Sequence, residues 1–225
     1  MPRSFFITGT DTGVGKTLVS CSLIHAFKVR GLKVAGMKPV ASGSEHTPEG
    51  LRNSDALALQ QAANVPAAYD TINPYCFEPA IAPHLAARQA GVSIELAKLQ
   101  VAYRQLCAEA EVVIVEGAGG WRVPLEHGYL SDFAEALKLD VVLVVGLRLG
   151  CINHAVLTAG VIQPGPCRLV GWVGNTIDPA FAPLQENLDT LAQRLPAPCL
   201  GVLPFSRAPD PLALSGLIDL GRLTL

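Results

Sequence analysis

Charged residues are scarce in this chain. Asp, Glu, Lys and Arg make up 16% of its 225 residues, against about 25% in an average soluble domain. Hydrophobic residues make up 50%, whereas disordered chains show the opposite balance, with much charge and few apolar side chains. The composition therefore argues against disorder, and the shortage of charge indicates surface that is covered in an oligomer.

The chain also lacks an excess of basic residues and any long hydrophobic run. It has 17 Lys and Arg against 19 Asp and Glu, for a net charge of −2, whereas proteins that bind nucleic acid or anionic lipid carry basic surfaces. Apolar runs such as residues 141–145 fall far short of the roughly 20 residues that span a membrane. We therefore predict no nucleic-acid partner and no membrane partner, so any phosphate site must be local.

The 6 cysteines form neither a Cys-x-x-Cys pair nor a set with zinc-ligand spacing. Met1-Pro2-Arg3-Ser4 leads directly into an apolar run, so we expect no signal peptide. The even number of cysteines leaves a disulfide set open. Free thiols in a reducing cytoplasm are the favoured interpretation, and we expect a cytoplasmic location.

Apolar runs of strand length alternate with segments of helical periodicity, without a linker, a repeat or a low-complexity tract. The expected strands are residues 5–8, 33–40, 111–115, 141–145, 169–173 and 200–203. The expected helices are residues 16–30, 54–63 capped by Ser54-Asp55, 93–109, 131–138, 153–161 and 183–194. The Pro-rich stretches 64–83 and 162–168 are expected to be ordinary connections.

Strands that are apolar throughout are buried on both faces, as in a parallel sheet covered by helices. The sequence therefore predicts an α/β fold with one doubly wound domain over residues 1–225. Its sheet is mainly parallel with helices on both faces. Ligands of such a fold bind at the carboxyl ends of the strands.

A glycine-rich segment, Gly9-Thr10-Asp11-Thr12-Gly13-Val14-Gly15-Lys16-Thr17, joins the first expected strand to the first helix. Glycines there let backbone N–H groups point at phosphate oxygens, and the helix N-terminus adds a positive dipole end. Lys16 can reach the β- and γ-phosphates, and the Thr17 hydroxyl can bind Mg²⁺. The ordinary pattern has its first glycine at the position of Thr10, one residue later than Gly9. A glycine-rich turn with a chance Gly-Lys-Thr is the alternative, and the strand–loop–helix context favours a P-loop of the NTPase type.

Two carboxylates are candidates for holding the metal ion that a P-loop requires. Glu116 ends an apolar strand and is followed by Gly117-Ala118-Gly119-Gly120, which resembles a Walker B arrangement. Asp55 stands at the start of a helix. Taken alone, Glu116 could simply cap its strand, and Asp55 could simply be an acid favoured by the helix dipole.

Four further segments narrow the choice among P-loop families. They are 36–43 (GMKPVASG), 47–56 (TPEGLRNSDA), 149–154 (LGCINH) and 171–175 (GWVGN). Together with residues 9–17 and 115–120, they closely resemble the dethiobiotin synthases of the biotin pathway. The resemblance extends from about residue 5 to residue 205, nearly the whole chain.

The resemblance implies an ATP- and Mg²⁺-dependent cyclo-ligase that forms C–N bonds. Such an enzyme converts 7,8-diaminononanoate and CO₂ to dethiobiotin, with release of ADP and phosphate. One substrate amine captures CO₂ as a carbamate, and the carbamate attacks the γ-phosphate to give a carbamic–phosphoric anhydride. The second amine then closes the cyclic urea. The family also implies a homodimer.

The resemblance assigns roles to residues of this chain. Lys38 and Lys16 match catalytic positions, and Thr17, Asp55 and Glu116 match metal ligands. The ATP-binding positions are Gly13, Val14, Gly15, Lys16, Thr17, Leu18, Asp55, Glu116, Gly117, Ala118, Gly119, Asn175, Thr176, Pro204, Phe205 and Ser206. The substrate-binding positions are Thr12, Ser42, Gly150, Cys151, Ile152 and Asn153, of which the last four belong to a segment that acts across a dimer interface.

Simpler roles and departures from the family pattern accompany these assignments. Asn153 could equally be the N-cap of the expected helix 153–161, and Lys38 could be a solvated strand end. Gly13 stands where relatives often carry Glu, so a side-chain role there is missing. Residues 210–225 do not align well.

Three other functions compete with this one. The main alternative is a regulatory or partitioning ATPase of the deviant-Walker kind, which needs a second lysine early in the P-loop, where this chain has Asp11. A nucleotide-binding module without chemistry would not need Lys38 and two metal-type carboxylates. A Rossmann dehydrogenase would carry GxGxxG instead of a loop that ends in Gly15-Lys16-Thr17.

Overall fold

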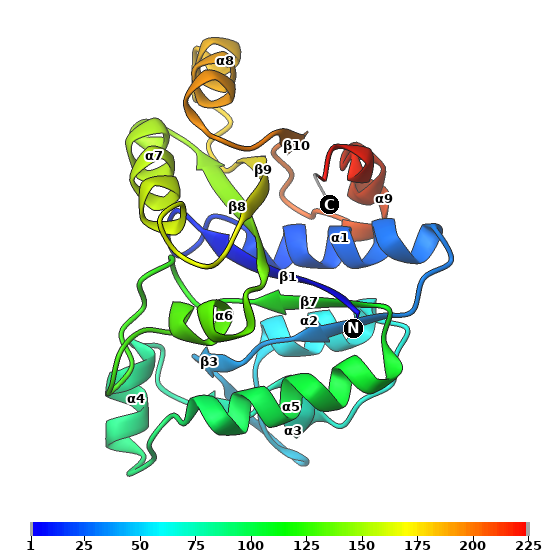
Figure 1. The fold of residues 1–225 in the computed structure, drawn as a ribbon, viewed down its shortest axis with the longest axis vertical. Coiled ribbons are helices and arrows are strands. Elements are labelled where there is room, and N and C mark those ends of the chain that lie inside the picture. The colour runs from blue at the N-terminus through cyan, green and yellow to red at the C-terminus, as the bar shows by residue number, and fades with distance from the viewer. Residues whose placement is uncertain (1, 224–225) are drawn as a thin grey trace.

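The computed structural model describes residues 2–223; residues 1, 224 and 225 of the expected domain lie outside the described part. Its centre is a six-stranded sheet in the order β10-β9-β8-β1-β7-β2, with every neighbouring pair parallel (Figure 1). The strands are β1 (Arg3–Gly9), β2 (Val34–Met37), β7 (Val112–Glu116), β8 (Asp140–Leu147), β9 (Leu169–Thr176) and β10 (Cys199–Leu203). All six expected strands are therefore present in one sheet.

Helices cover both faces of this sheet (Figure 1). Side chains of β1 alternate, because Phe5 and Ile7 pack into one core and Phe6 packs into the other. The first face carries α1 (Lys16–Val29), α2 (Ser54–Ala62) and α9 (Pro211–Leu214). The opposite face carries α5 (Leu96–Glu109), α6 (Ser131–Leu137), α7 (Cys151–Ile162) and α8 (Leu184–Arg194). This arrangement confirms the doubly wound α/β fold.

Short elements between α1 and α5 differ from expectation. The strand expected over residues 33–40 ends at Met37, because Lys38 N donates to Ile72 O at 2.8 Å instead of to a neighbouring strand. β3 (Val40–Ser42) pairs with β6 (Tyr75–Phe77), and β4 (Glu45–Thr47) pairs with β5 (Gly50–Arg52). The stretch 64–83, expected to be a plain connection, contains β6 and α3 (Tyr69–Ile72) and leads into α4 (Pro83–Gln89).

The starts of two helices and the cap of a third also differ from expectation. α5 begins at Leu96 instead of residue 93. Asn53 caps α2, because its Oδ1 atom accepts the N–H groups of Asp55 and Ala56, so the expected Ser54-Asp55 cap is wrong. α7 has Gly150 as its N-cap, which places Asn153 inside the first turn and rules out the cap role considered for it.

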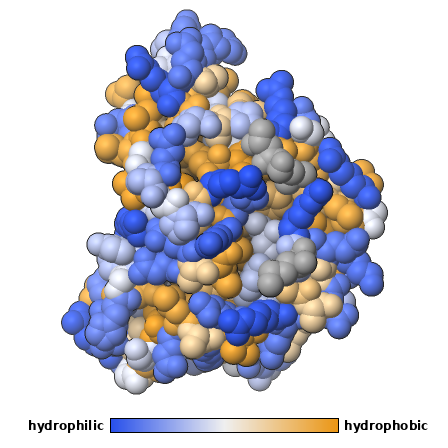
Figure 2. All heavy atoms as spheres, viewed as in Figure 1, coloured by the Kyte–Doolittle hydropathy of each residue, from blue (hydrophilic) through white to orange (hydrophobic). Residues whose placement is uncertain are grey.

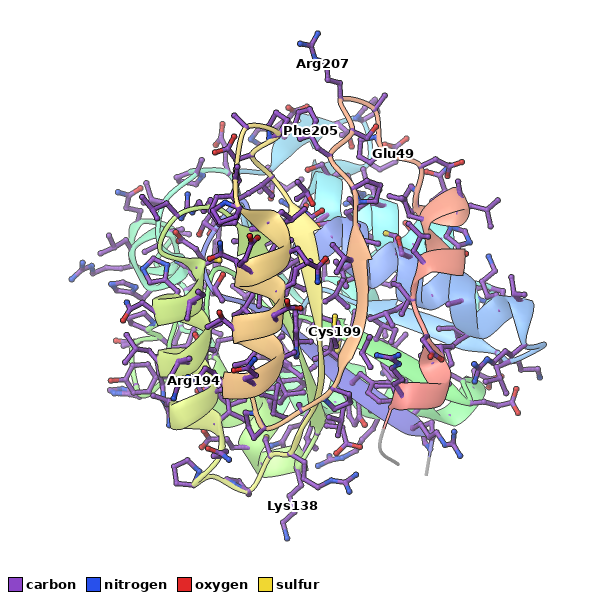
Figure 3. The ribbon with its side chains drawn as sticks, turned by 90° about the horizontal axis from the view of Figure 1, so that it is seen from above. Glu49, Lys138, Arg194, Cys199, Phe205 and Arg207 are labelled. Carbon is purple, nitrogen blue, oxygen red and sulfur yellow. The ribbon has the colours of Figure 1, made fainter. Side chains whose placement is uncertain are left out.

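Different residues lie at the two ends of the parallel strands. The carboxyl ends of the parallel strands meet at one edge, from which Phe205 and Arg207 follow β10 (Figure 3). Lys138, which ends α6 with a left-handed φ of 50°, lies at the opposite edge (Figure 3). Residues 2–223 include all 6 cysteines, and each is a free thiol. We find no helix in this part of the chain with the length and apolar character needed to cross a bilayer.

Candidate active site

The P-loop leaves the carboxyl end of β1 and opens α1. Gly13 and Gly15 have φ angles of 75° and 90°, a region that favours glycine. A Cβ atom on Gly15 would collide with the side-chain amide of Asn175. Gly15 is also the N-cap of α1, and no side chain in residues 2–223 accepts from its first turn. The N-terminus of α1 therefore offers free N–H groups and a positive dipole end to an anion.

Lys16 extends along this loop and is largely buried. Its Nζ atom donates to Asp11 O at 3.0 Å. The pKa of Lys16 is lowered to about 8, mainly by burial and to a smaller extent by repulsion from Lys38. A polyphosphate would favour the charged form of Lys16 again, so the loop is prepared for a strongly anionic ligand.

Four residues predicted from the sequence meet beside the loop. Lys38 Nζ lies 2.6 Å from Glu116 Oε1 and 2.8 Å from Asp55 Oδ2. Thr17 Oγ1 donates to the same Glu116 oxygen at 3.0 Å. Burial disfavours the charged form of Lys38, but the two carboxylates outweigh it and raise its pKa. Burial likewise opposes the ionised form of Asp55, and Lys38 outweighs it and lowers the pKa of Asp55.

The oxygens of this cluster fit a magnesium ion. Mg²⁺ is bound in proteins by one or two carboxylates and completes its shell with phosphate and water oxygens. Glu116 and Asp55 supply two carboxylates, and Thr17 supplies a hydroxyl. Glu116 Oε2 is buried without a hydrogen-bond partner among the described residues, which suits an atom that binds a cation.

Asn53 positions Asp55 in this cluster. Its side chain caps α2. Asn53 Oδ1 accepts the N–H of Asp55 at 3.1 Å and the N–H of Ala56 at 3.3 Å. The Asp55 carboxylate is therefore free to face Lys38. Asn53 itself is buried, and its N–H donates to the Tyr69 hydroxyl at 2.7 Å.

Asn53→Ala is expected to lower the free energy of unfolding by about 1–2 kcal/mol, because a lost N-cap leaves N–H groups of α2 unpaired. Since Asp55 loses its support, kcat should also fall severalfold. Urea unfolding and steady-state kinetics measure the two effects. Asn64→Ala is the matched control: the Asn64 side chain also bonds backbone groups, Val34 N and Leu32 O, at the opposite edge of the sheet. An equal fall in kcat for both variants would contradict a specific role for Asn53.

A cleft of about 780 Å³ lies beside the cluster. Its polar lining includes Thr12, Lys16, Lys38 and Ser42, and the Ser42 Oγ atom is buried without a hydrogen-bond partner in the described chain. The lining also includes Thr17, Asp55, Glu116 and Arg122, and its apolar part comes from Ala41, Ala80, Ile81, Ala82, Pro83, Ala118, Val123 and Pro124. The cleft therefore combines a charged end with a wall suited to a hydrocarbon chain.

Sequence reasoning missed part of this wall. Residues 80–83 belong to the stretch that was expected to be a plain connection, and residues 122–124 follow the Walker B-like glycines. The apolar run Ala80-Ile81-Ala82 in a Pro-rich connection was the only available signal.

The expected base-binding residues lie on the other side of the P-loop. Asn175 Nδ2 donates to Val14 O at 2.9 Å. Asn175 pairs in register with Leu203 of β10, so Thr176, the last residue of β9, and residues 204–206, which follow β10, lie at the ends of adjacent strands. In the described part of the chain, residues 2–223, none of these residues lines the cleft.

The segment Gly150-Cys151-Ile152-Asn153 begins α7 and is also absent from the lining of the cleft in the described chain. Arg148, just before it, reaches the P-loop instead, and its guanidinium lies 2.6 Å from Asp11 Oδ2. Thus the position that carries a lysine in deviant-Walker ATPases is an acid paired with an arginine in this chain.

Comparisons with known proteins agree with these features. A family model described as an AAA domain matches residues 3–211. The ATP-dependent dethiobiotin synthetase BioD of Pseudomonas paraeruginosa is 55% identical over 219 residues, which cover 96% of each chain. The protein of the same name from Xanthomonas oryzae pv. oryzae is 52% identical over 205 residues, 91% of this chain and 92% of the relative.

A solved structure resembles the fold at much lower identity. A ParA family ATPase from Chlorobium tepidum superposes with a TM-score of 0.59 at 15% identity, covering 99% of this chain and 94% of that one. At such an identity the likeness concerns the fold alone.

Proposed function

The chain belongs to the family of ATP-dependent dethiobiotin synthetases, and from this premise we propose that its cleft carries out the complete carboxylation and ring closure of 7,8-diaminononanoate. The enzyme is a ligase that forms C–N bonds and uses ATP. The observation that carries the proposal is the cluster of Lys38, Thr17, Asp55 and Glu116 between the P-loop and the cleft. We infer that residues 1–225 act as one synthetase domain.

The nucleotide is held by the P-loop in this proposal. N–H groups of residues 13–18 and the Lys16 ammonium contact the phosphates. Thr17, Asp55 and Glu116 would hold Mg²⁺, which would supply positive charge for the phosphates. On the far side of the loop, the adenine base lies against Asn175, Thr176, Pro204, Phe205 and Ser206.

Three chemical steps follow. One amine of the diamine attacks CO₂ and loses a proton, giving a carbamate. A carbamate oxygen attacks the γ-phosphorus, the bond to the β-phosphate oxygen breaks, and ADP leaves. The second amine attacks the carbonyl carbon of the resulting anhydride, loses a proton and expels inorganic phosphate, which closes the cyclic urea.

Lys38 and Lys16 are the catalytic residues for these steps. The carbamate and the γ-phosphate are both anionic, and they approach each other only where positive charge is concentrated. The ammonium groups of Lys38 and Lys16 both line the cleft and supply that charge. Thr12 and Ser42 are placed to donate hydroxyl hydrogens to the carbamate or the anhydride.

The carbon chain of the substrate fits the apolar wall of the cleft. Ile81, Pro83, Val123 and Pro124 offer contacts to methylene groups, and each buried methylene contributes about 0.8 kcal/mol. The two amines then lie at the charged end, beside Lys38. The wall thus selects for a long aliphatic diamine and orients it.

Conversion by the purified protein tests the reaction directly. With diaminononanoate, ¹³C-bicarbonate, ATP and Mg²⁺, we expect mass spectrometry to detect a cyclic urea that contains the label, with ADP and phosphate released in equal amounts. Omission of the diamine should abolish phosphate release. ATP hydrolysis at an unchanged rate without diamine and bicarbonate would favour the deviant-Walker ATPase instead.

The exposed side of α7 supports a homodimer. Val156, Leu157 and Val161 on this helix and Leu149 just before it are exposed large hydrophobic residues, and Leu157 and Val161, four residues apart, share one helical face. Figure 2 shows apolar side chains at the surface over α7, at the upper left. We infer that this face packs on a second copy and carries residues 150–153 to the cleft of the partner. A cytoplasmic location and the absence of nucleic-acid and membrane partners stay predictions.

Mixing two inactive variants tests this shared site. Lys16→Ala and Asn153→Ala are each expected to be inactive, and after subunit exchange about a quarter of wild-type activity should return. The reason is that half of the dimers are mixed, and one of the two sites in each mixed dimer carries neither substitution. Activity is measured after exchange has been verified by mass spectrometry. Verified exchange without recovery would place Asn153 in the cleft of its own subunit.

A further inference from the structure

The Lys38 ammonium lies where the ligands of the proposed metal site converge. Its Nζ atom is 2.6 Å from Glu116 Oε1 and 2.8 Å from Asp55 Oδ2, and Thr17 Oγ1 is 3.0 Å from the same Glu116 oxygen. The side chains of Lys38 and Glu116 are 5% and 0% exposed. The Asp55 side chain is 37% exposed. The lysine therefore offsets part of the negative charge of two acids that line the cleft.

A metal ion on the two oxygens that now hold the ammonium would compete with it. Mg²⁺ binds oxygens at about 2.0–2.1 Å. A metal ion on Glu116 Oε1 and Asp55 Oδ2 would therefore lie less than about 5 Å from an ammonium that kept its present contacts. Like charges at that separation repel strongly where water is largely excluded.

The backbone of Lys38 is held by hydrogen bonds, so a movement of this residue would involve its side chain alone. Its backbone N–H donates to Ile72 O at 2.8 Å, and its carbonyl accepts from Asn73 Nδ2 at 2.7 Å. Beyond the two acids, Nζ contacts Gly117 O at 3.2 Å. Lys38 and Ser42 line the same cleft. An ammonium that leaves the acids therefore moves into the space where the γ-phosphate and the carbamate are proposed to meet.

We propose that Lys38 and the divalent metal ion compete for Glu116 and Asp55, and that Lys38 leaves this pair for the cleft when the metal arrives with ATP. The inference rests on the proposed function, since it concerns the same catalytic lysine. Before ATP binds, Lys38 stabilises the buried Glu116 and the partly exposed Asp55, which would otherwise repel each other. Afterwards its charge serves the reacting groups, so the lysine is withheld from the cleft until the metal nucleotide is in place.

Titration of the nucleotide-free protein with Mn²⁺, with the free ion followed by EPR, tests the competition. Lys38→Met removes the competing ammonium and keeps an unbranched side chain. We expect this variant to bind Mn²⁺ at least about tenfold more tightly than the wild type, because no internal cation has to be displaced.

Lys16→Met is the matched control. Lys16 also acts on Glu116 and Asp55 through space, but its ammonium donates to Asp11 O and touches neither acid. Its removal should therefore tighten Mn²⁺ binding by less than about threefold. An unchanged or weaker affinity in Lys38→Met, or an equal gain in Lys16→Met, would overturn the proposal.

A second variant guards against a failure of Lys38→Met to fold. The amide of Lys38→Gln can still donate to Glu116, so the acids keep a partner, and this variant should also bind Mn²⁺ several times more tightly than the wild type. Unchanged affinity in a folded Lys38→Gln protein would overturn the proposal as well. The Mn²⁺ titration involves no diamine and no ATP, so absence of cyclic-urea formation by the wild type would refute the proposed function separately.

Discussion

Lys16→Ala is expected to lower kcat by at least about 10³-fold, equivalent to about 4 kcal/mol of transition-state stabilisation. The substitution removes a buried ammonium whose contacts strengthen as negative charge redistributes on the transferred phosphoryl group. Single-turnover measurement of phosphate release at saturating ATP reports the chemical step. Circular dichroism and urea unfolding establish that the variant is folded.

Lys28→Ala controls for the loss of a lysine from the same helix. Lys28 lies in the last turn of α1, and its ammonium donates to Ala62 O, away from the P-loop. This variant should keep a near-normal kcat. A near-normal kcat in Lys16→Ala, with intact dependence on ATP, would contradict the assignment of the P-loop.

Lys38→Gln is expected to lower kcat by about 10²–10³-fold, the usual effect of removing one group that stabilises developing charge. Affinity for ATP without a divalent metal ion should change by less than about threefold, because the phosphates are held mainly by the P-loop. Calorimetric titration with a non-hydrolysable ATP analogue measures affinity, and saturating kinetics measure kcat.

Lys98→Gln is a suitable comparison for this substitution, since Lys98 lies exposed on α5 over the ring of Tyr75. It should leave both quantities near their wild-type values. Suppose instead that Lys38→Gln loses ATP affinity and keeps its kcat at saturation. Lys38 would then be a binding residue, and the charge that assists phosphoryl transfer would have to come from elsewhere.

The sheet was predictable from the sequence because each of its strands is an apolar run that stands out by itself. All six are present, and their ends shift by a few residues where neighbours compete for the same backbone groups. Lys38 shows the cause at β2: its N–H bonds to Ile72 O, and nothing in a local pattern reveals that partner. β3, β4, β5 and β6 are 3 residues long each, too short for periodicity to identify.

The parts of the site that were predictable are those carried by local motifs. The P-loop and Glu116 follow strands in a recognisable pattern, and Lys38 and Asp55 followed from the family resemblance, which the relatives confirm. The bridging of both acids by Lys38 was not predictable, because it depends on how three separate elements pack. The role of Asn53 was missed because Ser54 and Asp55 are equally good cap residues by type.

The parallel strands also give the molecule a side to which other groups can be attached safely. Gly31, between α1 and β2, and Lys138, between α6 and β8, are exposed on turns that lead into strands, and a Cβ atom on Gly31 would meet open space. A fluorophore or surface tether at either turn would project from the edge opposite the P-loop. If one preparation carried a donor fluorophore at Lys138 and a second carried an acceptor at the same residue, energy transfer would report subunit exchange. Neither dye would lie near the reacting groups.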